Sequence, residues 1–373
     1  MASGHPWIFS SDVIDRGAAQ PGDAVEVADH KGRKIGTAHY SSTSQITLRM
    51  LSARSGPIDR AFFRKRLEDA EAFRKRFVVG TDAYRLVHGE ADFLPGLVVD
   101  RYAEYLTIQT LDQGMDAAKP DVLACLEDLL HPKGIVARND VAVRKLESLP
   151  QEITILSGQI PEKVPISMNG LRWEANLLEG QKTGVFLDQR ENYAAAAKYA
   201  SGRGLDCFTC TGGFALHLAA RCETVEAVDS SAKALASAET NAKLNNIANV
   251  TFREADVFDL LAGHDAAHRR YDIIVLDPPA FAKSRNALQD AARGYKEINL
   301  RALRILKPGG ILVTCSCSHH FSEALLLETL AEAALDAGRT LRVLERRTQA
   351  QDHPILLTVP ETHYLKCVIA EVR

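Results

Sequence analysis

The hydrophobic and polar residues follow different patterns in successive parts of the chain. Up to residue 57, short apolar runs alternate with groups of Gly, Pro, Ser and Asp, which predicts β-strands joined by turns. The predicted strands are 24–27, 34–40 and 45–51. Short strands at this spacing are typical of a small β-barrel, so we expect residues 1–57 to form one.

The segment from Asp59 to Phe77 has the pattern of an amphipathic helix, because its apolar residues recur at three- and four-residue intervals. It also carries seven Lys or Arg residues and four acidic residues. Two interpretations of this charged face stay open. It is either ordinary solvated surface, or a patch that contacts RNA phosphates with Arg64 and Lys65 as candidate RNA-binding residues.

Between residues 80 and 180 the strand and helix patterns are mixed. Strands are predicted at 83–87, 96–100, 105–109 and 134–137, and a helix at 115–130. The Asn169-Gly170 pair between two further apolar runs predicts a hairpin turn. We therefore expect a small α+β middle domain over residues 58–180.

After residue 185, predicted strands and helices alternate. The strands are 204–208, 224–228, 250–254, 271–276 and 310–315, and the helices include 213–221, 231–245 and 291–305. This alternation predicts a Rossmann-like, doubly wound parallel sheet with helices on both faces, in a third domain over residues 181–373.

The composition limits the class of protein. Hydrophobic residues make up 46% of the chain and charged residues 25%, which is ordinary for a globular protein. No run approaches the ~18 apolar residues that a membrane helix needs, and the first residues lack the apolar core of a signal peptide. The odd number of cysteines, seven, favours reduced thiols. We expect a cytoplasmic protein with no membrane partner. The net charge of −3 excludes a global basic field but allows a local basic patch.

Candidate binding residues follow the predicted strands of the third domain, because ligands of such sheets bind beyond the carboxyl ends of the strands. The first strand leads into a loop of small residues that ends at Gly212, without the spacing of a dinucleotide fingerprint. Asp229, Asp256 and Asp277 come at the ends of the next three strands. An acid after the second strand can accept hydrogen bonds from ribose hydroxyls, although each acid alone is also explained as a helix cap.

Taken in order, these features resemble a class I S-adenosylmethionine-dependent methyltransferase. Four further motifs narrow the resemblance to the ribosomal RNA large subunit methyltransferase I family. They are HPWIFS at 5–10, LPGLVVDRY at 94–102, GVFLDQR at 184–190 and DPPAF at 277–281. The resemblance covers essentially the whole chain. It implies a PUA domain, a small middle domain and a methyltransferase domain, and methylation of carbon 5 of a cytosine in 23S ribosomal RNA.

The resemblance also implies the cofactor, the partners and most of the site. The cofactor is S-adenosylmethionine, the partner is 23S rRNA, and the family forms homodimers. The expected cofactor-binding residues are Gln189, Arg190, Asp206, Thr211, Gly212, Phe214, Asp229, Asp256 and Asp277. For Arg190, a structural salt bridge is the competing interpretation.

The cytosine reaction needs a thiolate, because carbon 5 becomes nucleophilic only after a nucleophile adds to carbon 6. Cys317 is at the position of the family's nucleophile, and Asp277 is expected to hydrogen-bond the flipped base. Cys315 would share a face with Cys317 in an extended strand, so only the motif separates the two. Many related enzymes have a second cysteine after the Asp-x-Pro turn; Ala280 occupies that position here, which fits a single-cysteine arrangement.

Two other groups have competing interpretations. Cys207 and Cys210 have the spacing of a redox pair or of half a zinc site, but no second pair follows at zinc spacing. We therefore interpret them as wall residues of the cofactor loop, and His319-His320 as an ordinary loop, and expect no metal site. The alternative functions are an RNA guanine N-methyltransferase, which needs no thiol, and a non-catalytic RNA-binding ribosome-assembly factor.

Overall fold

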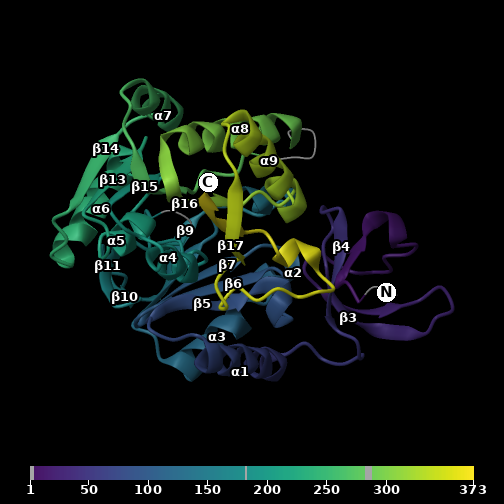
Figure 1. Cartoon of the computed structure of the whole chain (residues 1–373). Helices are drawn as coiled ribbons and strands as arrows, with labels where there is room; N and C mark the ends of the chain where they lie inside the picture. The colour runs from purple at the N-terminus through teal and green to yellow at the C-terminus, as the bar shows by residue number, and fades with distance from the viewer. Residues whose placement is uncertain (1–3, 181–182, 282–287) are drawn as a thin grey trace. The chain divides into compact units, whose positions relative to one another are not determined.

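The computed structural model describes residues 4–180, 183–281 and 288–373 (Figure 1). The chain forms two compact units. The first comprises Met1–Gly170, Ala175–Leu187 and Gln351–Thr362, and the second comprises Leu171–Glu174, Asp188–Ala350 and His363–Arg373. Each unit therefore contains segments from distant parts of the sequence. The division into domains 1–57, 58–180 and 181–373 stays a prediction.

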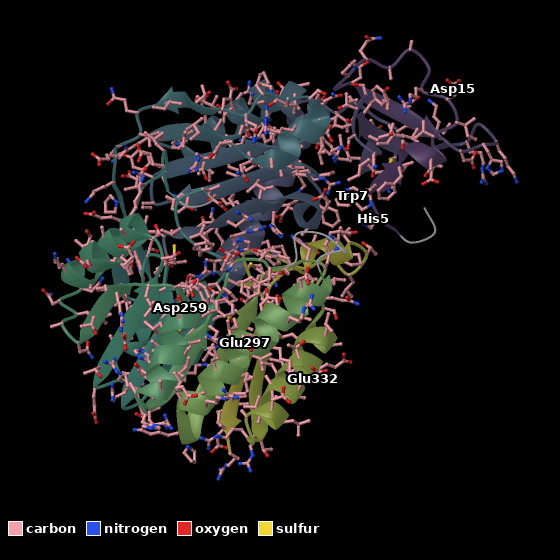
Figure 2. The ribbon with its side chains drawn as sticks, turned by 90° about the horizontal axis from the view of Figure 1, so that it is seen from above. His5, Trp7, Asp15, Asp259, Glu297 and Glu332 are labelled. Atoms are coloured by element: carbon pink, nitrogen blue, oxygen red, sulfur yellow. The ribbon has the colours of Figure 1, made fainter. Side chains whose placement is uncertain are left out.

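The first unit begins with a four-stranded antiparallel sheet. Its strands are β1 (Trp7–Phe9), β2 (Ala24–Ala28), β3 (Lys34–Tyr40) and β4 (Ile46–Ser52), in the order β1-β4-β3-β2. The three predicted strands are confirmed, and β1 is an addition. Trp7 and His5 lie side by side (Figure 2), with their ring centroids 5.0 Å apart, and the Trp7 indole N–H donates to Glu90.

A buried charge cluster ties this sheet to the rest of the first unit. Arg49 of β4 donates to the Glu147 carboxylate at 2.8 Å, and the Ser41 hydroxyl donates to its other oxygen at 2.6 Å. Both carboxylate oxygens of Glu147 are thus satisfied although its side chain is 1% exposed. Burial of an ion pair is tolerated only with such compensation, so this contact specifies how the sheet packs.

A five-stranded sheet follows in the first unit, in the order β5-β6-β7-β8-β9. Its strands are β5 (Ala83–His88), β6 (Leu97–Tyr102), β7 (Tyr105–Thr110), β8 (Gly134–Arg138) and β9 (Ile153–Gly158). The associated helices are α1 (Arg60–Phe77), α2 (Gln113–Ala117) and α3 (Lys119–Leu130). The helix predicted over 115–130 is wrong in one respect: it is interrupted at Ala118, because Pro120 starts a new helix.

Strands β10 (Val164–Met168) and β11 (Leu171–Ala175) flank the predicted turn, where Asn169 and Gly170 both have positive φ. Short 3₁₀ helices lie at Ser10–Asp12, Gly89–Asp92, Ala142–Glu147 and Pro360–Thr362. No helix among the described residues has the length and apolar character needed to cross a membrane.

The second unit is built on a seven-stranded sheet in the order β14-β13-β12-β15-β16-β18-β17. Its strands are β12 (Arg203–Cys207), β13 (Thr224–Asp229), β14 (Val250–Glu254), β15 (Tyr271–Leu276), β16 (Leu306–Ser316), β17 (Leu341–Arg347) and β18 (Lys366–Val372). The five predicted strands are confirmed and are mutually parallel, whereas β18 runs antiparallel to both its neighbours. The sequence predicted a parallel sheet. The observed sheet is mixed, because β18 is antiparallel to its neighbours.

Helices cover both faces of this sheet (Figure 1). They are α4 (Arg190–Ala197), α5 (Gly213–Leu218), α6 (Ala232–Leu244), α7 (Val257–Ala266), α8 (Leu288–Ile305) and α9 (Glu323–Asp336). One apolar core joins α7, α8 and α9 to the sheet, and a second joins α4 and α5 to its other face. The strands between these cores are buried on both sides, so their carboxyl ends are held firmly in register.

Candidate active site

The strand register brings the predicted site residues to one edge of the sheet. Cys207 of β12 pairs with Val228 of β13 and with Leu276 of β15, and Leu276 pairs with Thr314 of β16. These four residues form one row across the sheet. The residues that follow them therefore emerge at the same edge of the sheet, with Asp229 and the Asp277 turn on the two strands that flank β12.

The loop after β12 has an unusual backbone. Phe208, Cys210 and Gly212 all have positive φ, at 64°, 49° and 91°. Such angles are uncommon for residues other than Gly and cluster at functional sites. The Cys210 amide donates to an Asp229 carboxylate oxygen at 2.9 Å, which fixes the loop against the end of β13.

Asp206 lies beneath this loop and is fully buried. One of its carboxylate oxygens accepts from the Thr209 hydroxyl at 2.6 Å and from the Ala215 amide at 2.8 Å. The other oxygen, Oδ1, is buried with no hydrogen-bond partner among the described residues. Burial raises the pKa of Asp206 to about 7. A buried oxygen with unused acceptor capacity is a place for a donor from a ligand.

Asp229 and Asp256 both have structural roles as well. Asp229 is half-buried, and its second oxygen accepts from the Ser231 amide at 2.9 Å. Asp256 is exposed and caps α7, with its carboxylate accepting from the Asp259 amide at 3.1 Å. Each carboxylate keeps room for further donors, so the capping role and a ligand role are compatible.

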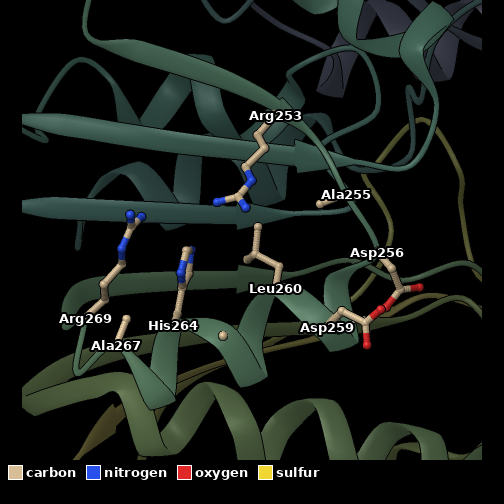
Figure 3. A pocket seen from close by; sticks show the side chains of 9 residues that line it. Arg253, Ala255, Asp256, Asp259, Leu260, His264, Ala267 and Arg269 are labelled. Atoms are coloured by element: carbon tan, nitrogen blue, oxygen red, sulfur yellow. Dashed lines mark hydrogen bonds between the residues drawn. The ribbon is translucent and has the colours of Figure 1, made fainter.

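Asp256 also lies at one end of a pocket of about 330 Å³ between β14 and α7 (Figure 3). Asp256 and Asp259 form its acidic end, His264 and Arg269 lie at the other end, and Arg253 lies between them. The pocket therefore adjoins the row of strand ends on its acidic side. Its basic residues lie on β14 (Arg253), on α7 (His264) and after the end of α7 (Arg269).

Gln189 and Arg190 begin α4 and are both buried. The Gln189 amide donates to the Asp277 carboxylate at 2.9 Å and accepts from Asn192 at 2.7 Å. Gln189 thus orients Asp277. The Arg190 guanidinium lies 3.5 Å from a carboxylate oxygen of Glu191, so the salt-bridge interpretation also has a geometric basis.

Thr211 and Phe214 differ in their surroundings. The Thr211 carbonyl accepts from Asn241 at 3.1 Å, which anchors the loop to α6. Phe214 is 3% exposed and packs edge-on against Tyr193, with ring centroids 4.8 Å apart. Its ring is thus part of the core beneath the loop, and its cofactor role stays a prediction.

The two candidate nucleophiles have opposite surroundings. Cys315 lies inside β16, is fully buried beside Cys367, and burial raises the pKa of its thiol well above the ordinary value. Cys317 follows the last residue of β16, is half-buried, and its sulfur lies 4.0 Å from the Pro278 carbonyl oxygen. Only Cys317 therefore combines access with a position beside the Asp277-Pro278-Pro279 turn.

Two residues that the sequence interpretation missed support the Cys317 segment. Tyr295 of α8 is buried, and its hydroxyl hydrogen-bonds Ser316 at 2.9 Å and Ser318 at 3.1 Å. Lys366 donates to the Ser318 carbonyl at 2.6 Å. Neither residue carried a sequence signal, because a tyrosine on an apolar helix face and a lysine at a strand start are both commonplace.

The remaining candidates are accounted for individually. Burial raises the pKa of the Cys210 thiol to about 12 and that of Cys207 well above its ordinary value, so both stay thiols in the wall of the loop.

His319 is exposed beside Tyr364, at 5.4 Å between ring centroids. Within residues 4–180, 183–281 and 288–373, no group of three His, Cys, Asp or Glu side chains is placed to hold a metal ion.

Arg64 and Lys65 lie on the exposed face of α1, in the first unit. Arg64 pairs with Glu68 at 3.0 Å, and Lys65 pairs with Asp69 at 2.7 Å. The helix thus neutralises much of its own charge. The RNA-binding role of these two residues stays a prediction.

Comparisons with known proteins agree over the whole chain. A model of S-adenosylmethionine-dependent methyltransferases matches residues 137–363, and a model of PUA-like domains matches residues 1–53. The chain is 41% identical over 377 residues to the ribosomal RNA large subunit methyltransferase I of Shewanella amazonensis, with 99% of this chain and 95% of that protein covered. The protein of the same name from Klebsiella pneumoniae is 39% identical over 371 residues, with coverage of 97% and 93%.

Solved structures show the same fold. A protein described as a methyltransferase, solved with S-adenosylhomocysteine, superposes with a TM-score of 0.85 at 21% identity, over 99% of this chain and 96% of that one. A SAM-dependent methyltransferase from Streptococcus mutans superposes with a TM-score of 0.83 over the same shares of the two chains. The expected fold class, a Rossmann-like methyltransferase preceded by a PUA-like domain, is thereby confirmed, as is the cofactor, S-adenosylmethionine.

Proposed function

The chain belongs to the ribosomal RNA large subunit methyltransferase I family, and we propose that it methylates carbon 5 of a cytosine in 23S rRNA through a covalent adduct with Cys317. It is an S-adenosylmethionine-dependent rRNA methyltransferase. The observation that supports the cytosine reaction is the accessible Cys317 thiol beside the Asp277-Pro278-Pro279 turn. A homodimer stays a prediction.

The residues at the strand ends fit the cofactor. S-adenosylmethionine, when bound, supplies an electrophilic methyl group on a sulfonium. The unpartnered oxygen of buried Asp206 is a suitable acceptor for the ammonium group of the cofactor. We assign Asp229 to the ribose hydroxyls, and the loop that ends at Gly212 to close backbone contact. Gln189, Arg190, Thr211, Phe214 and Asp256 complete the proposed cofactor site.

In the proposed reaction, the Cys317 thiolate adds to carbon 6 of the cytosine, and the electron pair of the 5,6 double bond moves toward carbon 5. Carbon 5 is then nucleophilic enough to accept a methyl group. Loss of the proton on carbon 5 to a base restores the 5,6 double bond and expels the thiolate. Asp277, oriented by Gln189, is placed to hydrogen-bond the polar edge of the flipped base and to stabilise the adduct.

The main alternative is N-methylation of a guanine. A tRNA m1G37 methyltransferase from M. jannaschii shares the fold with a TM-score of 0.53 at 14% identity, a likeness that extends to the fold alone. Guanine chemistry needs no thiol, so an accessible cysteine beside the Asp-Pro-Pro turn favours cytosine. A non-catalytic assembly factor is disfavoured because Asp206, Asp229 and Asp277 are all present at the strand ends.

Covalent trapping tests the proposal. With 5-fluorocytosine at the target position, the wild-type enzyme should form a stable protein–RNA adduct, because fluorine does not leave as a proton does. Cys317→Ala should form no adduct and lose roughly 10³-fold or more in turnover, while cofactor binding measured by calorimetry is retained. Cys315→Ala is the matched control and should trap normally.

Two results would contradict the proposal. An adduct that persists in Cys317→Ala and disappears in Cys315→Ala would make Cys315 the nucleophile. Absence of any adduct, together with methylation mapped to a guanine nitrogen, would support the guanine alternative. Mapping 5-methylcytosine in 23S rRNA from a deletion strain and its parent identifies the modified nucleotide.

A further inference from the structure

Lys366 is a buried cation without a carboxylate partner. It is the first residue of β18 and is 3% exposed. Its ammonium donates to the backbone carbonyls of Ser318 at 2.6 Å and Tyr364 at 2.8 Å. Among the described residues, Glu323 is the one carboxylate whose charge acts on it. A buried ammonium normally requires a nearby anion, since carbonyl dipoles compensate only part of the cost of its desolvation.

The position of Lys366 is fixed relative to Cys317. In the antiparallel pair of β16 and β18, Lys366 lies opposite Ser316, the residue before Cys317. The Ser318 carbonyl that accepts from Lys366 belongs to the residue after Cys317. The ammonium therefore contacts the residue after the candidate nucleophile, and the backbone of Lys366 pairs with the residue before it.

The other charged groups around Lys366 are already paired. Glu323, at the start of α9, carries a negative charge that acts on Lys366, but its two oxygens accept from Arg346 at 2.7 and 2.8 Å. His363 also interacts with Glu323. Tyr295 of α8 is hydrogen-bonded to Ser316 and Ser318, and burial raises the pKa of its hydroxyl, so it is neutral near pH 7. Because Glu323 is engaged by Arg346, the negative charge that acts most strongly on Lys366 is that of Cys317.

We infer that Lys366 is the counter-ion of the Cys317 thiolate, and so a positioning residue for the nucleophile of the methylation reaction. The inference rests on the proposed function in one respect only, the use of Cys317 as nucleophile. The chemistry is that of thiolate activation, in which an adjacent cation favours the ionised sulfur over the thiol.

The protonation of Lys366 agrees with this role. Burial lowers the pKa of Lys366 to about 8, and a negative charge on Cys317 raises it. The interaction is reciprocal, so a protonated Lys366 favours the thiolate of Cys317 to the same extent. Near pH 7.5 most of the lysine is still protonated, and the thiolate–ammonium pair is the form that can attack carbon 6.

The pH dependence of Cys317 alkylation tests the inference without any methylation step. Iodoacetamide labelling is followed by mass spectrometry of the peptide that contains Cys317, in the full-length wild type and in Lys366→Met and Lys366→Gln. Gln keeps an N–H donor for the two carbonyls but removes the charge. Lys296→Met, which removes a partly exposed lysine of α8 paired with Glu332 and Asp336, is the matched control.

In both Lys366 variants the midpoint of alkylation should move up by about one pH unit or more, so that labelling near pH 7 slows roughly tenfold. The Lys296→Met midpoint should equal that of the wild type. Cofactor affinity, measured by calorimetry, should be retained in Lys366→Gln, which shows that the fold persists. Turnover should fall with the loss of thiolate and recover as the pH is raised.

An unchanged midpoint in Lys366→Gln would overturn the inference and reduce Lys366 to a structural donor, even if turnover falls. The proposed function fails by a different result, namely full turnover in Cys317→Ala. The alkylation midpoints are independent of that result, so the two failures are distinguishable.

Discussion

Cys315 and Cys317 are only two residues apart, but their side chains differ in burial and therefore in reactivity. Cys315 is enclosed by the core beside Cys367, whereas Cys317 lies beyond the last hydrogen-bonded residue of β16. An alternating strand pattern places both on one face, so strand geometry could not distinguish them and only the family motif favoured Cys317. The end of β16 at Ser316 distinguishes them, and that end depends on pairing with β18 about 50 residues later in the chain.

Asp206 gives a residue-scale prediction. Because burial raises its pKa from 3.8 to about 7, the folded protein retains a proton that the unfolded chain has lost between these values. The stability contributed by this proton is present at low pH and is lost as the pH rises toward 7. Scanning calorimetry without cofactor measures the melting temperature at pH 5 and at pH 7. The decrease between these two pH values should be smaller for Asp206→Asn than for the wild type.

The same substitution should weaken cofactor binding, because the charged acceptor proposed for the ammonium group is removed. Loss of a charged hydrogen bond costs about 1.5–3 kcal/mol, which corresponds to roughly 10- to 150-fold in affinity. Isothermal calorimetry at pH 8 measures this change. Unchanged affinity would remove Asp206 from the cofactor site.

Lys366 could not have been identified from the sequence for a related reason. Its acceptors are the backbone carbonyls of Ser318 and Tyr364, and carbonyls are present at every position. Asp206, Asp229 and Asp277 were identifiable because acids at the ends of successive strands form a pattern. A residue whose role depends on long-range pairing with main-chain atoms leaves no such pattern.

At the scale of elements, the loop after β12 depends on one glycine. Gly212 has a φ of 91°, and an added Cβ would lie 3.2 Å from the Leu216 side chain and 3.3 Å from that of Ala238. Gly212→Ala should lose about 1 kcal/mol or more of stability through backbone strain, and should also weaken cofactor binding. Gly309, with a φ of 79° and no atom within 4 Å of an added Cβ, provides the control.

Gly309→Ala should show a similar loss of stability, measured by denaturant unfolding, with unchanged cofactor affinity. If both variants bound the cofactor equally well, the loop would not be part of the cofactor site. The comparison separates backbone strain in general from strain at this loop.

Helix α1 provides an element-scale prediction about RNA. Arg64→Glu together with Lys65→Glu should weaken rRNA binding and reduce its salt dependence, since each lost phosphate contact lowers the log–log slope by about 0.7–0.9. Stability should change little, because exposed ion pairs such as Arg64–Glu68 contribute at most about 1 kcal/mol. Filter binding at several salt concentrations measures both quantities. Unchanged RNA affinity would make this helix face ordinary solvated surface.

Two of the strands that the sequence interpretation missed, β9 and β17, lie at the edges of their sheets and have little burial. An exposed edge strand needs no strong apolar pattern, so the sequence marks it weakly. The inner parallel strands β15 and β16 were identifiable because burial on both faces favours continuous apolar runs. The break between α2 and α3 follows from Pro120, which was visible in the sequence but outweighed by the helical pattern around it.

At the scale of the whole molecule, the first unit includes a segment from near the end of the chain, Gln351–Thr362. Asp352 in this segment is fully buried, and its carboxylate accepts from the Arg85 amide at 2.9 Å. Its carbonyl accepts from the Arg74 guanidinium at 2.8 Å. Buried Arg74 also forms an ion pair with Asp92, so the late segment completes a charged cluster in the first unit.

A fragment of residues 1–187 should therefore be less stable than the same residues in the full chain. Removal of the Asp352 carboxylate and carbonyl leaves buried donors unsatisfied, at about 1–3 kcal/mol for each group. Thermal unfolding followed by circular dichroism measures the difference, and a synthetic peptide of residues 351–362 added in excess should raise the melting temperature. A fragment as stable as the intact protein, or one indifferent to the peptide, would contradict this prediction.

The late segment also affects the order in which the protein folds during its synthesis. A nascent chain emerges from the ribosome from its N-terminus, and domains that are continuous in sequence can fold as they appear. Here the first unit lacks one acceptor of Arg74, the Asp352 carbonyl, and the carboxylate that accepts from the Arg85 amide until residues 351–362 have been translated. The N-terminal unit, although made first, can therefore reach its final form only when nearly the entire polypeptide has been synthesised.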